Sequence, residues 1–167
     1  MPASPTWRPM TADDVEAVIR LAAAIHQDHP EDDAVLTERF ALMPEACLIL
    51  EGSDGPIGYV LAHPCLFEKP PALNALMGTV PEGSDCLHLH DIALLPAARG
   101  TGAAGKAVEH VAKVGKAHGL AHVSIVSVNG TEPFWEKQGF RLHTSPALEQ
   151  KLASYEGSSS YMLRDLR

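Results

Sequence analysis

Two histidines one residue apart, His88 and His90, lie in the apolar stretch LHLHDIALL. The alternating side chains predict a β-strand, in which residues two apart point to the same face with Cα atoms roughly 7 Å apart. Histidine is the side chain best suited to accept a proton near neutral pH, so the pair is a candidate general base. The alternative interpretation is that both rings are packing residues on a half-buried strand.

The same alternation bears on a metal site, because a His-x-His pair can bind a metal ion. One face of the strand would carry Cys86, His88, His90, Ile92 and Leu94, and the other Leu87, Leu89, Asp91 and Ala93. Asp91 would then point away from the histidines, and no third ligand is evident. The sequence therefore predicts no metal, although a β-bulge in this strand would shift the pattern.

The stretch RGTGAAGKA, from Arg99 to Ala107, follows this strand and opens a predicted helix. Backbone N–H groups in the first turn of a helix have no partner within the helix, and together with the helix dipole they attract anions. Arg99, Gly102 and Ala104 fit the pattern R-x-x-G-x-A, a pyrophosphate loop that needs no metal ion. A plain glycine-rich turn between a strand and a helix remains the alternative.

Two nucleotide-binding patterns fit the same stretch less well. The P-loop requires a Ser or Thr after its lysine, and this chain has Ala107 after Lys106. The dinucleotide pattern requires an Asp or Glu at the end of the next strand, and this chain has Asn129 there. Each pattern therefore lacks an oxygen ligand that its nucleotide needs.

Hydrophobic periodicity and turn residues predict the elements that position these groups. Thr11 is a candidate N-cap of the first helix. Helices are predicted over residues 11–25, 32–43, 100–118 and 131–138. Strands are predicted over residues 6–10, 46–52, 57–67, 86–95, 121–128, 140–144 and 160–166, with a long loop over residues 68–85.

The order β-α-α-β-β-β-α-β-α-β-β predicts one domain over residues 1–167. An antiparallel hairpin comes early in the chain and a β-α-β unit lies in the middle. The fold class is therefore mixed α/β (α+β), with a mixed, mostly antiparallel sheet flanked by helices.

Composition sets limits on the partners. The chain has 167 residues, of which 46% are hydrophobic and 20% charged, and a formal net charge of −8. The negative charge argues against a nucleic-acid partner and suits a small cationic substrate. No apolar run is long enough for a membrane span, and the stretch MPASPTWRPM lacks an apolar signal region, so a cytoplasmic location is expected. Three cysteines without a C-x-x-C pair are expected to be buried thiols.

The chain resembles the GNAT superfamily of acetyl-CoA-dependent N-acetyltransferases. LHDIALLPAARGTGAAGKAVEHV resembles the central motif of that family, NGTEPFWEKQGFRL the next motif, and WRPMTADDVEAVIRL a typical beginning. The resemblance extends over nearly the whole chain and implies the GNAT acyl-CoA N-acyltransferase fold. Within the superfamily the chain is most similar to the arylalkylamine (serotonin-type) N-acetyltransferase branch, whose hallmark is a His-x-His pair such as His88 and His90.

This resemblance implies a set of residues that bind acetyl-CoA. The backbone of Ile92, Ala93 and Leu94 would pair with the pantetheine arm, and the Leu94 amide would hold the developing oxyanion. Phe134 and Trp135 would line the thiol end, and Asn129 is included in the binding set. The pyrophosphate would lie on the loop formed by Arg99, Gly100, Thr101, Gly102, Ala103, Ala104 and Gly105.

One position departs from the family pattern. The family usually has a Tyr where this chain has Trp135, and that Tyr protonates the departing thiolate. An indole N–H donates a hydrogen bond but is not a useful acid. Tyr155 and Tyr161 are candidate replacements from the C-terminal part of the chain.

The resemblance implies acetyl transfer to a primary amine, with His88 and His90 removing a proton from the ammonium. The acceptor site is expected between loop 68–85 and residues 26–33, where acidic side chains would attract a cation: Asp28, Glu31, Asp32 and Asp33. An aryl-alkyl or apolar primary amine is the first expectation and a polyamine the second. A protein or peptide N-acetyltransferase and a weakly catalytic CoA-binding module remain alternatives. No metal, nucleic acid or membrane partner is expected, and the sequence does not predict the oligomeric state.

Overall fold

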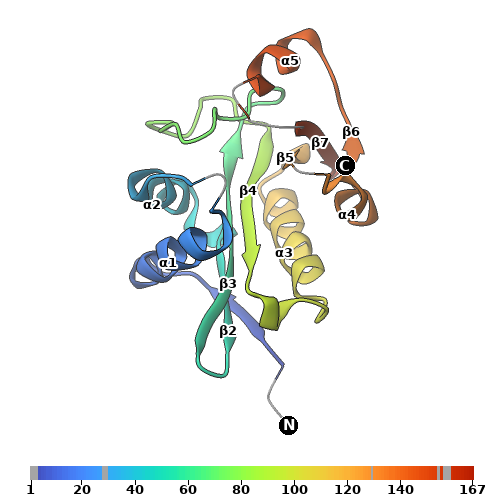
Figure 1. Cartoon of the computed structure of the whole chain (residues 1–167). Helices are drawn as coiled ribbons and strands as arrows, with labels where there is room; N and C mark the ends of the chain where they lie inside the picture. Colours follow the sequence, from blue (N-terminus) through green and yellow to red (C-terminus); the bar gives the residue numbers. More distant parts are fainter. Residues whose placement is uncertain (1–3, 28–29, 129, 154, 156–158) are drawn as a thin grey trace.

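The computed structural model describes residues 4–27, 30–128, 130–153, 155 and 159–167. Seven strands form one sheet in the order β1-β2-β3-β4-β5-β7-β6 (Figure 1). Neighbouring strands are antiparallel except β4 and β5, which are parallel. The strands are β1 (Thr6–Pro9), β2 (Leu48–Gly52), β3 (Gly55–Cys65), β4 (Cys86–Leu94), β5 (His122–Val128), β6 (Arg141–Leu142) and β7 (Ser159–Asp165). The predicted mixed, mostly antiparallel sheet is confirmed.

Helices cover both faces of this sheet (Figure 1). They are α1 (Val15–Ile25), α2 (Asp33–Leu42), α3 (Ala103–Ala117), α4 (Glu132–Lys137) and α5 (Pro146–Leu152), with short 3-10 turns at Ala12–Asp14, Pro44–Ala46 and Pro96–Ala98. Helices α1 and α2 pack with β2 and β3 in one apolar core. Helix α3 packs on the other face, where Val108 and Val111 meet Leu87 and Val123. The prediction of a sheet flanked by helices is therefore confirmed, and the structure places them on both faces.

The structure corrects two of the expected boundaries and adds one helix. Helix α3 begins at Ala103 rather than residue 100, because Gly100 and Gly102 have φ angles of 76° and 79° and cannot be helical. The strand expected over residues 140–144 is reduced to Arg141–Leu142. Helix α5 was not expected from the sequence, and it begins with Ser145, whose hydroxyl accepts a hydrogen bond from the Leu148 amide.

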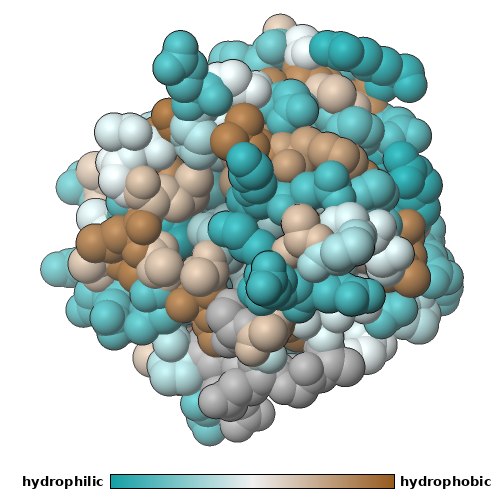
Figure 2. Space-filling view, turned by 90° about the horizontal axis from the view of Figure 1, so that it is seen from above, coloured by the Kyte–Doolittle hydropathy of each residue, from teal (hydrophilic) through white to brown (hydrophobic). Residues whose placement is uncertain are grey.

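The segment between β3 and β4, residues 66–85, contains neither helix nor strand. Hydrogen bonds attach it to α2: the Glu38 carboxylate accepts from the amides of Met77 and Gly78, and Arg39 donates to the Ala75 carbonyl. Figure 2, which looks down on this end of the molecule, shows separate apolar patches among hydrophilic side chains. Hydrogen bonds thus hold the long loop against α2, between the end of β3 and the start of β4.

Candidate active site

A β-bulge in β4 decides which side chains meet at the centre of the sheet. Strand β3 pairs Leu61 with Asp91 and Ala62 with Leu89, which leaves His90 as the extra residue. Beyond the bulge the facing of the side chains is reversed. Leu89 and Ile92, three residues apart, therefore both contact the core under α3.

The alternation expected across β4 is consequently wrong. Asp91 does not point away from the histidines, because Asp91, His88 and His90 line one cavity. Ile92 and Leu94 lie on the α3 side instead of sharing a face with His88. The cause is the inserted residue at position 90, since one extra residue exchanges the two faces of a strand.

Strands β4 and β5 separate beyond this point. Among the described residues they pair only at Cys86–His88 with His122–Ser124. The two strands then enclose a cleft of about 360 Å³. Seven of the predicted cofactor-binding residues line it: Ile92, Ala93, Leu94, Arg99, Ala104, Phe134 and Trp135. Asn129 lies outside the described residues.

The edge of β4 that faces this cleft is suited to an extended ligand. Residues Ile92–Leu94 pair with Gly58–Val60 of β3 on one side, and their other side borders the cleft. Backbone groups at an open strand edge can pair with an extended chain such as a pantetheine arm. The geometry therefore fits the arm of acetyl-CoA at the residues expected for it.

The glycine loop borders the cleft, whose lining includes Arg99 and Ala104. Gly102 is the N-cap of α3 with φ 79°, and Gly100 has φ 76°, a region that favours glycine. Thr101 donates to the Ala98 carbonyl (2.5 Å) and accepts from the Ala103 amide (3.3 Å), which fixes the turn. The first turn of a helix directs free N–H groups outward, so this loop can hold a phosphate.

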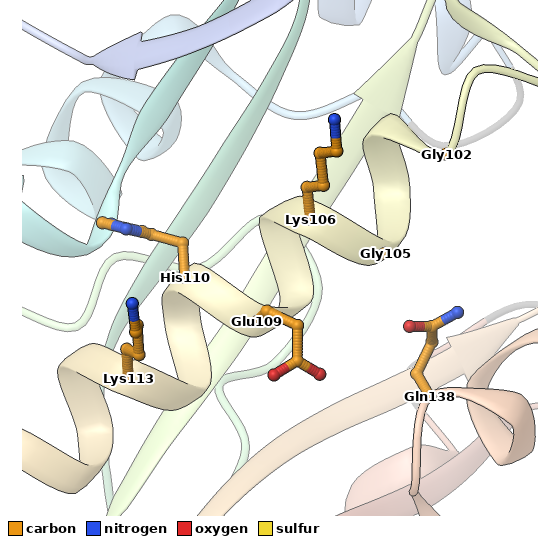
Figure 3. Close-up of a pocket in the computed structure, with 7 residues that line it drawn as sticks. All are labelled: Gly102, Gly105, Lys106, Glu109, His110, Lys113 and Gln138. Atoms are coloured by element: carbon orange, nitrogen blue, oxygen red, sulfur yellow. The ribbon is translucent and has the colours of Figure 1, made fainter.

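A second pocket of about 590 Å³ continues from the loop along the exposed side of α3. Lys106, His110 and Lys113 project from one side of the helix, and Glu109 projects toward the side where Gln138 lies (Figure 3). Two lysines beside a loop that can hold a phosphate add positive charge, which would attract further phosphate groups. A phosphate chain bound at the loop would therefore have room to continue along α3.

A smaller cavity of about 150 Å³ lies beside the bulge, where His88, His90 and Asp91 of β4 line it. Its lining residues are His26, Glu31, Leu73, His88, His90, Asp91, Val126, Val128 and Tyr155. Five of these also line the cleft: His26, His90, Asp91, Val126 and Val128. The cleft and this cavity therefore meet at His26, His90 and Asp91.

The predicted acidic segment reaches the cavity through Glu31 alone among its described members. Asp28 lies outside the described residues, and Asp32 and Asp33 are exposed at the start of α2. Loop 68–85 contributes Leu73 to the lining. One carboxylate and one apolar side chain from the expected segments thus face the cavity.

The two predicted histidines have different surroundings. His88 is buried, its Nδ1 lies 2.9 Å from the Ser124 hydroxyl, and burial lowers its pKa well below the ordinary value. His90 Nε2 donates to Glu31 Oε1 over 2.6 Å. Burial acts to raise the pKa of Glu31, but the hydrogen bond and charge of His90 outweigh it and the pKa is lowered. His88 is therefore a neutral ring, and His90 is paired with a carboxylate.

A third histidine, His63, completes the cluster. It pairs with His88 across the strands, and its ring centroid lies 5.5 Å from that of His88 and 6.0 Å from that of His90. Its Nδ1 donates to the Pro64 carbonyl, and burial lowers its pKa to about 3. Sequence reasoning missed His63, because only the strand register brings it beside the other two.

Asp91 joins two further groups at the junction. His26 Nε2 lies 2.8 Å from Asp91 Oδ1, and the Tyr59 hydroxyl donates to Oδ2. The hydrogen bond to Asp91 raises the pKa of His26, with burial opposing it. Burial acts to raise the pKa of Asp91, but His26 and its other partners lower it. Sequence reasoning did not select His26 or Asp91 as site residues. They meet because the end of α1 lies beside the bulged part of β4, and no local sequence pattern indicates that contact.

The aromatic residues expected near the thiol end of the cofactor do not all line the cleft. Trp135 and Phe134 line the cleft, with ring centroids 4.9 Å apart. Tyr155 lines the smaller cavity and donates to the Pro71 carbonyl, and burial raises its pKa to about 12. Tyr161 is buried in β7, where its hydroxyl accepts from the Glu68 amide, and it lines neither cavity.

In the part of the chain that the structure describes, no group of three or more His, Cys, Asp or Glu side chains is arranged to hold a metal ion. None of the described helices has the length and apolar character needed to cross a membrane.

Comparison with solved structures gives similar folds over nearly the whole chain. The loading GNATL domain of CurA from Lyngbya majuscula has a TM-score of 0.78 at 13% identity, with 98% of each chain covered. Ard1 from Thermoplasma volcanium has a TM-score of 0.72 at 14% identity, again with 98% of each chain covered. Arabidopsis thaliana Naa50, in complex with the bisubstrate analogue CoA-Ac-MVNAL, has a TM-score of 0.67 at 14% identity, covering 96% of this chain and 97% of that one.

At these identities the structural similarity shows the fold. Curated protein sequences gave no significant match. The profile of the acetyltransferase (GNAT) family, however, matches residues 14–140, which is most of the chain. The protein therefore belongs to the acetyltransferase (GNAT) family and is an acyltransferase with acetyl-CoA as its co-substrate.

Proposed function

We propose that this enzyme transfers an acetyl group to a small primary amine, with an aryl-alkyl amine as the first candidate. The observation that carries the proposal is the junction between the cleft and the cavity at His26, His90 and Asp91. Two cavities that meet at proton-transferring groups suit a reaction between two substrates. The proposal includes a cytoplasmic location, and three free, buried cysteines suit a reducing compartment.

The size and lining of the smaller cavity support a small acceptor. Its volume of about 150 Å³ is comparable to that of an engineered protein cavity that holds benzene. Leu73, Val126 and Val128 give it apolar walls, and Glu31 and Asp91 give it negative charge. An amine with one ring or a short alkyl chain would match this combination.

In the proposed mechanism, acetyl-CoA supplies a thioester whose carbonyl carbon is open to attack by the amine. The edge of β4 at Ile92–Leu94 would orient the pantetheine arm, and the Leu94 amide would stabilise the oxyanion. The amides of the α3 N-terminus with Arg99 would hold the pyrophosphate, and Lys106 and Lys113 would attract its outer phosphate groups. Phe134 and Trp135 would enclose the sulfur.

The histidines would remove the proton from the acceptor. An alkylammonium has a pKa of about 10, so it must lose a proton before its nitrogen can attack. His90 lies at the junction and His88 lies behind it in the same cavity. The neutral His88 ring beside His90 would let the pair accept and pass on that proton.

A protein or peptide N-acetyltransferase is the second candidate. The observation that favours it is that solved relatives in fold include Naa50 with a peptide-containing analogue and the NatC complex bound to Gag peptide. The attachment of loop 66–85 to α2 next to the small cavity argues for a compact acceptor instead. A CoA-binding module with weak catalysis is the third possibility.

The test is acetyl-CoA turnover against a panel of amines and peptides, with free thiol as the readout. Turnover of phenethylamine or tryptamine supports the proposal. Acetylation of peptides alone would replace it with the second candidate, and tight CoA binding without turnover of any acceptor with the third.

The paired substitution His88→Ala with His90→Ala tests the base. Loss of general-base catalysis lowers kcat by about 10²–10⁴-fold. The remaining rate depends on the free amine, so its pH profile shifts toward alkaline pH. His118→Ala, at an exposed histidine paired with Glu45, is the matched control and leaves kcat unchanged. An unchanged pH profile in the double variant would refute the role of the pair.

A further inference from the structure

We propose that His26 is the general acid that protonates the departing CoA sulfur, the role that Trp135 cannot perform. This inference rests on the proposed acetyl transfer. It assigns a catalytic residue to a position that the sequence patterns do not identify.

The first argument is position. The bond between acetyl carbon and sulfur must lie where the cofactor cleft meets the acceptor cavity, because one substrate occupies each. The residues common to both cavities include two histidines, His26 and His90, and histidine is the side chain suited to proton transfer near neutral pH. His90 donates to Glu31, and both Glu31 and His88 line the acceptor cavity and not the cleft. We therefore assign the base to His90 with His88, and His26 is the remaining histidine at the junction.

The second argument is the tautomer that the surroundings select. Asp91 accepts a hydrogen bond from His26 Nε2, and the Tyr59 hydroxyl holds the second oxygen of that carboxylate. The Nε2 proton is therefore retained, and a proton on Nδ1 is the one available for transfer. Among the described residues, His26 Nδ1 has no hydrogen-bond partner.

The third argument is charge and access. The groups that face His26 from the neighbouring elements are Asp91 and His90 of β4, Tyr59 of β3 behind Asp91, and Glu31 before α2. The two carboxylates favour the imidazolium, and the pKa of His26 is raised, first by the Asp91 hydrogen bond. The side chain is 33% exposed, so solvent can return a proton to it.

The amine nitrogen first loses one proton to the histidine pair, which passes it to solvent, and then forms a bond to the acetyl carbon. As the carbon–sulfur bond breaks, the nitrogen loses a second proton to the same pair. The electron pair of that bond remains on sulfur, which takes the Nδ1 proton of His26. The products are the amide, free CoA thiol and a neutral His26 that still donates through Nε2 to Asp91. Solvent then restores the imidazolium.

The alternative donors are less well placed. Tyr155 lines the acceptor cavity and not the cleft, and its hydroxyl is bonded to Pro71. Trp135 lines the cleft but carries an indole N–H that does not ionise in this range. The rival to be tested is therefore Tyr155.

The first experiment varies the leaving group. His26→Gln is assayed with acetyl-CoA and with the acetyl thioester of an aryl thiol, a leaving group acidic enough to depart without a proton. We expect kcat with acetyl-CoA to fall about 10²-fold or more, and the ratio of wild type to variant to approach unity with the aryl thioester. His118→Gln is the matched control, and it leaves both rates unchanged.

The outcomes separate the two proposals. If the wild type releases no thiol with any acceptor, the proposed function fails. If the wild type is active but the ratio for His26→Gln is the same for both donors, the general-acid role alone is overturned. If Tyr155→Phe shows the leaving-group dependence instead, the acid is Tyr155.

A second readout does not depend on turnover. NMR follows the histidine ring signals across a range of pH values. The signal that is absent in His26→Gln is assigned to His26. We expect His26 to titrate above the ordinary histidine value in the wild type, and at lower pH in Asp91→Asn, because Asp91 stabilises the imidazolium. A His26 that is already neutral below pH 6.5 in the wild type would overturn the inference.

Discussion

Outside the active site, the Asp14 carboxylate shows how strongly one cationic partner can lower the pKa of an acidic side chain. Arg8 donates two hydrogen bonds to Asp14, each 2.8 Å long, and the Thr11 amide donates a third. These bonds, foremost those from Arg8, lower the pKa of Asp14 to about 2 from 3.8, with burial opposing them. The carboxylate thus joins β1 to the start of α1.

Asp14→Asn tests this contact through the pH dependence of stability. Because the folded-state pKa is below the unfolded value, the stabilisation is present above about pH 4 and is lost as pH falls toward about 2. We expect the variant to lose about 1–2 kcal/mol of unfolding free energy at pH 7, a value reduced by the exposure of Arg8, and nothing near pH 2. Urea unfolding at both pH values measures this. Asp13→Asn, at an exposed neighbour, is the control, and an equal loss for Asp14→Asn at both pH values would contradict the assignment.

At the scale of elements, the N-terminus of α3 contains two glycines, and each is glycine for a different structural reason. Gly102 caps the helix with φ 79°, which an L side chain rarely adopts. Gly105 lies within the helix, where an added Cβ would approach Gln138 Oε1 to 3.4 Å. The first glycine allows the turn to form, and the second leaves space beside the expected phosphate.

Alanine at these two positions is therefore expected to act in opposite directions. Gly102→Ala introduces left-handed strain and lowers the unfolding free energy by about 1–2 kcal/mol. Gly105→Ala raises it by up to about 1 kcal/mol through helix propensity, while its methyl group weakens CoA binding. Urea unfolding and calorimetric titration with CoA measure the two effects. A Gly105→Ala protein that is destabilised as much as Gly102→Ala would refute this division.

At the scale of the whole molecule, the two proposed binding regions differ in charge. The net charge is −8, and Glu31 and Asp91 line the smaller cavity. Lys106 and Lys113 line the pocket along α3. The proposed cationic amine would therefore be attracted by the molecule as a whole, and the anionic co-substrate by one local region.

Salt dependence tests this arrangement. Screening shortens from roughly 30 Å at 0.01 M salt to roughly 3 Å at 1 M. We expect kcat/KM for a cationic alkylamine to fall several-fold over that range, and kcat/KM for an aryl amine that is neutral at the assay pH to change little. Steady-state kinetics with both amines at saturating acetyl-CoA measure the difference. Equal salt dependence for the two amines would show that charge does not guide the acceptor.

Local patterns in the sequence predicted the sheet, the helices that flank it and the position of the loop before α3. Gly102 and Ala104 predicted the loop, because small residues at a helix start let a ligand approach the free backbone N–H groups. Helix α5 was missed although Ser145 and Pro146 are local start signals, since its seven residues bury only Leu148. Short helices with one core contact leave little periodicity to detect.

The surroundings of the site were less predictable than its residue types. His88 and His90 are two apart on any strand, but the contact between Glu31 and His90 depends on how the segment before α2 meets β4. His63 reaches the cluster through the register of β3. The bulge at position 90 leaves no trace in composition, and it reversed the predicted place of Asp91.

The bulge also has a consequence for insertions and deletions in this strand. Residues up to Leu89 and residues from Asp91 are in opposite phase, although both halves keep their pairing with β3. Removal of His90 would join the two halves in one regular alternation, because Leu61 and Ala62 of β3 already pair with Asp91 and Leu89. Asp91 would keep its face toward His26 and Tyr59, and Ile92 would keep its face toward α3. A single deletion at the bulge would thus remove the histidine that meets Glu31 and leave the facing of the other β4 side chains unchanged.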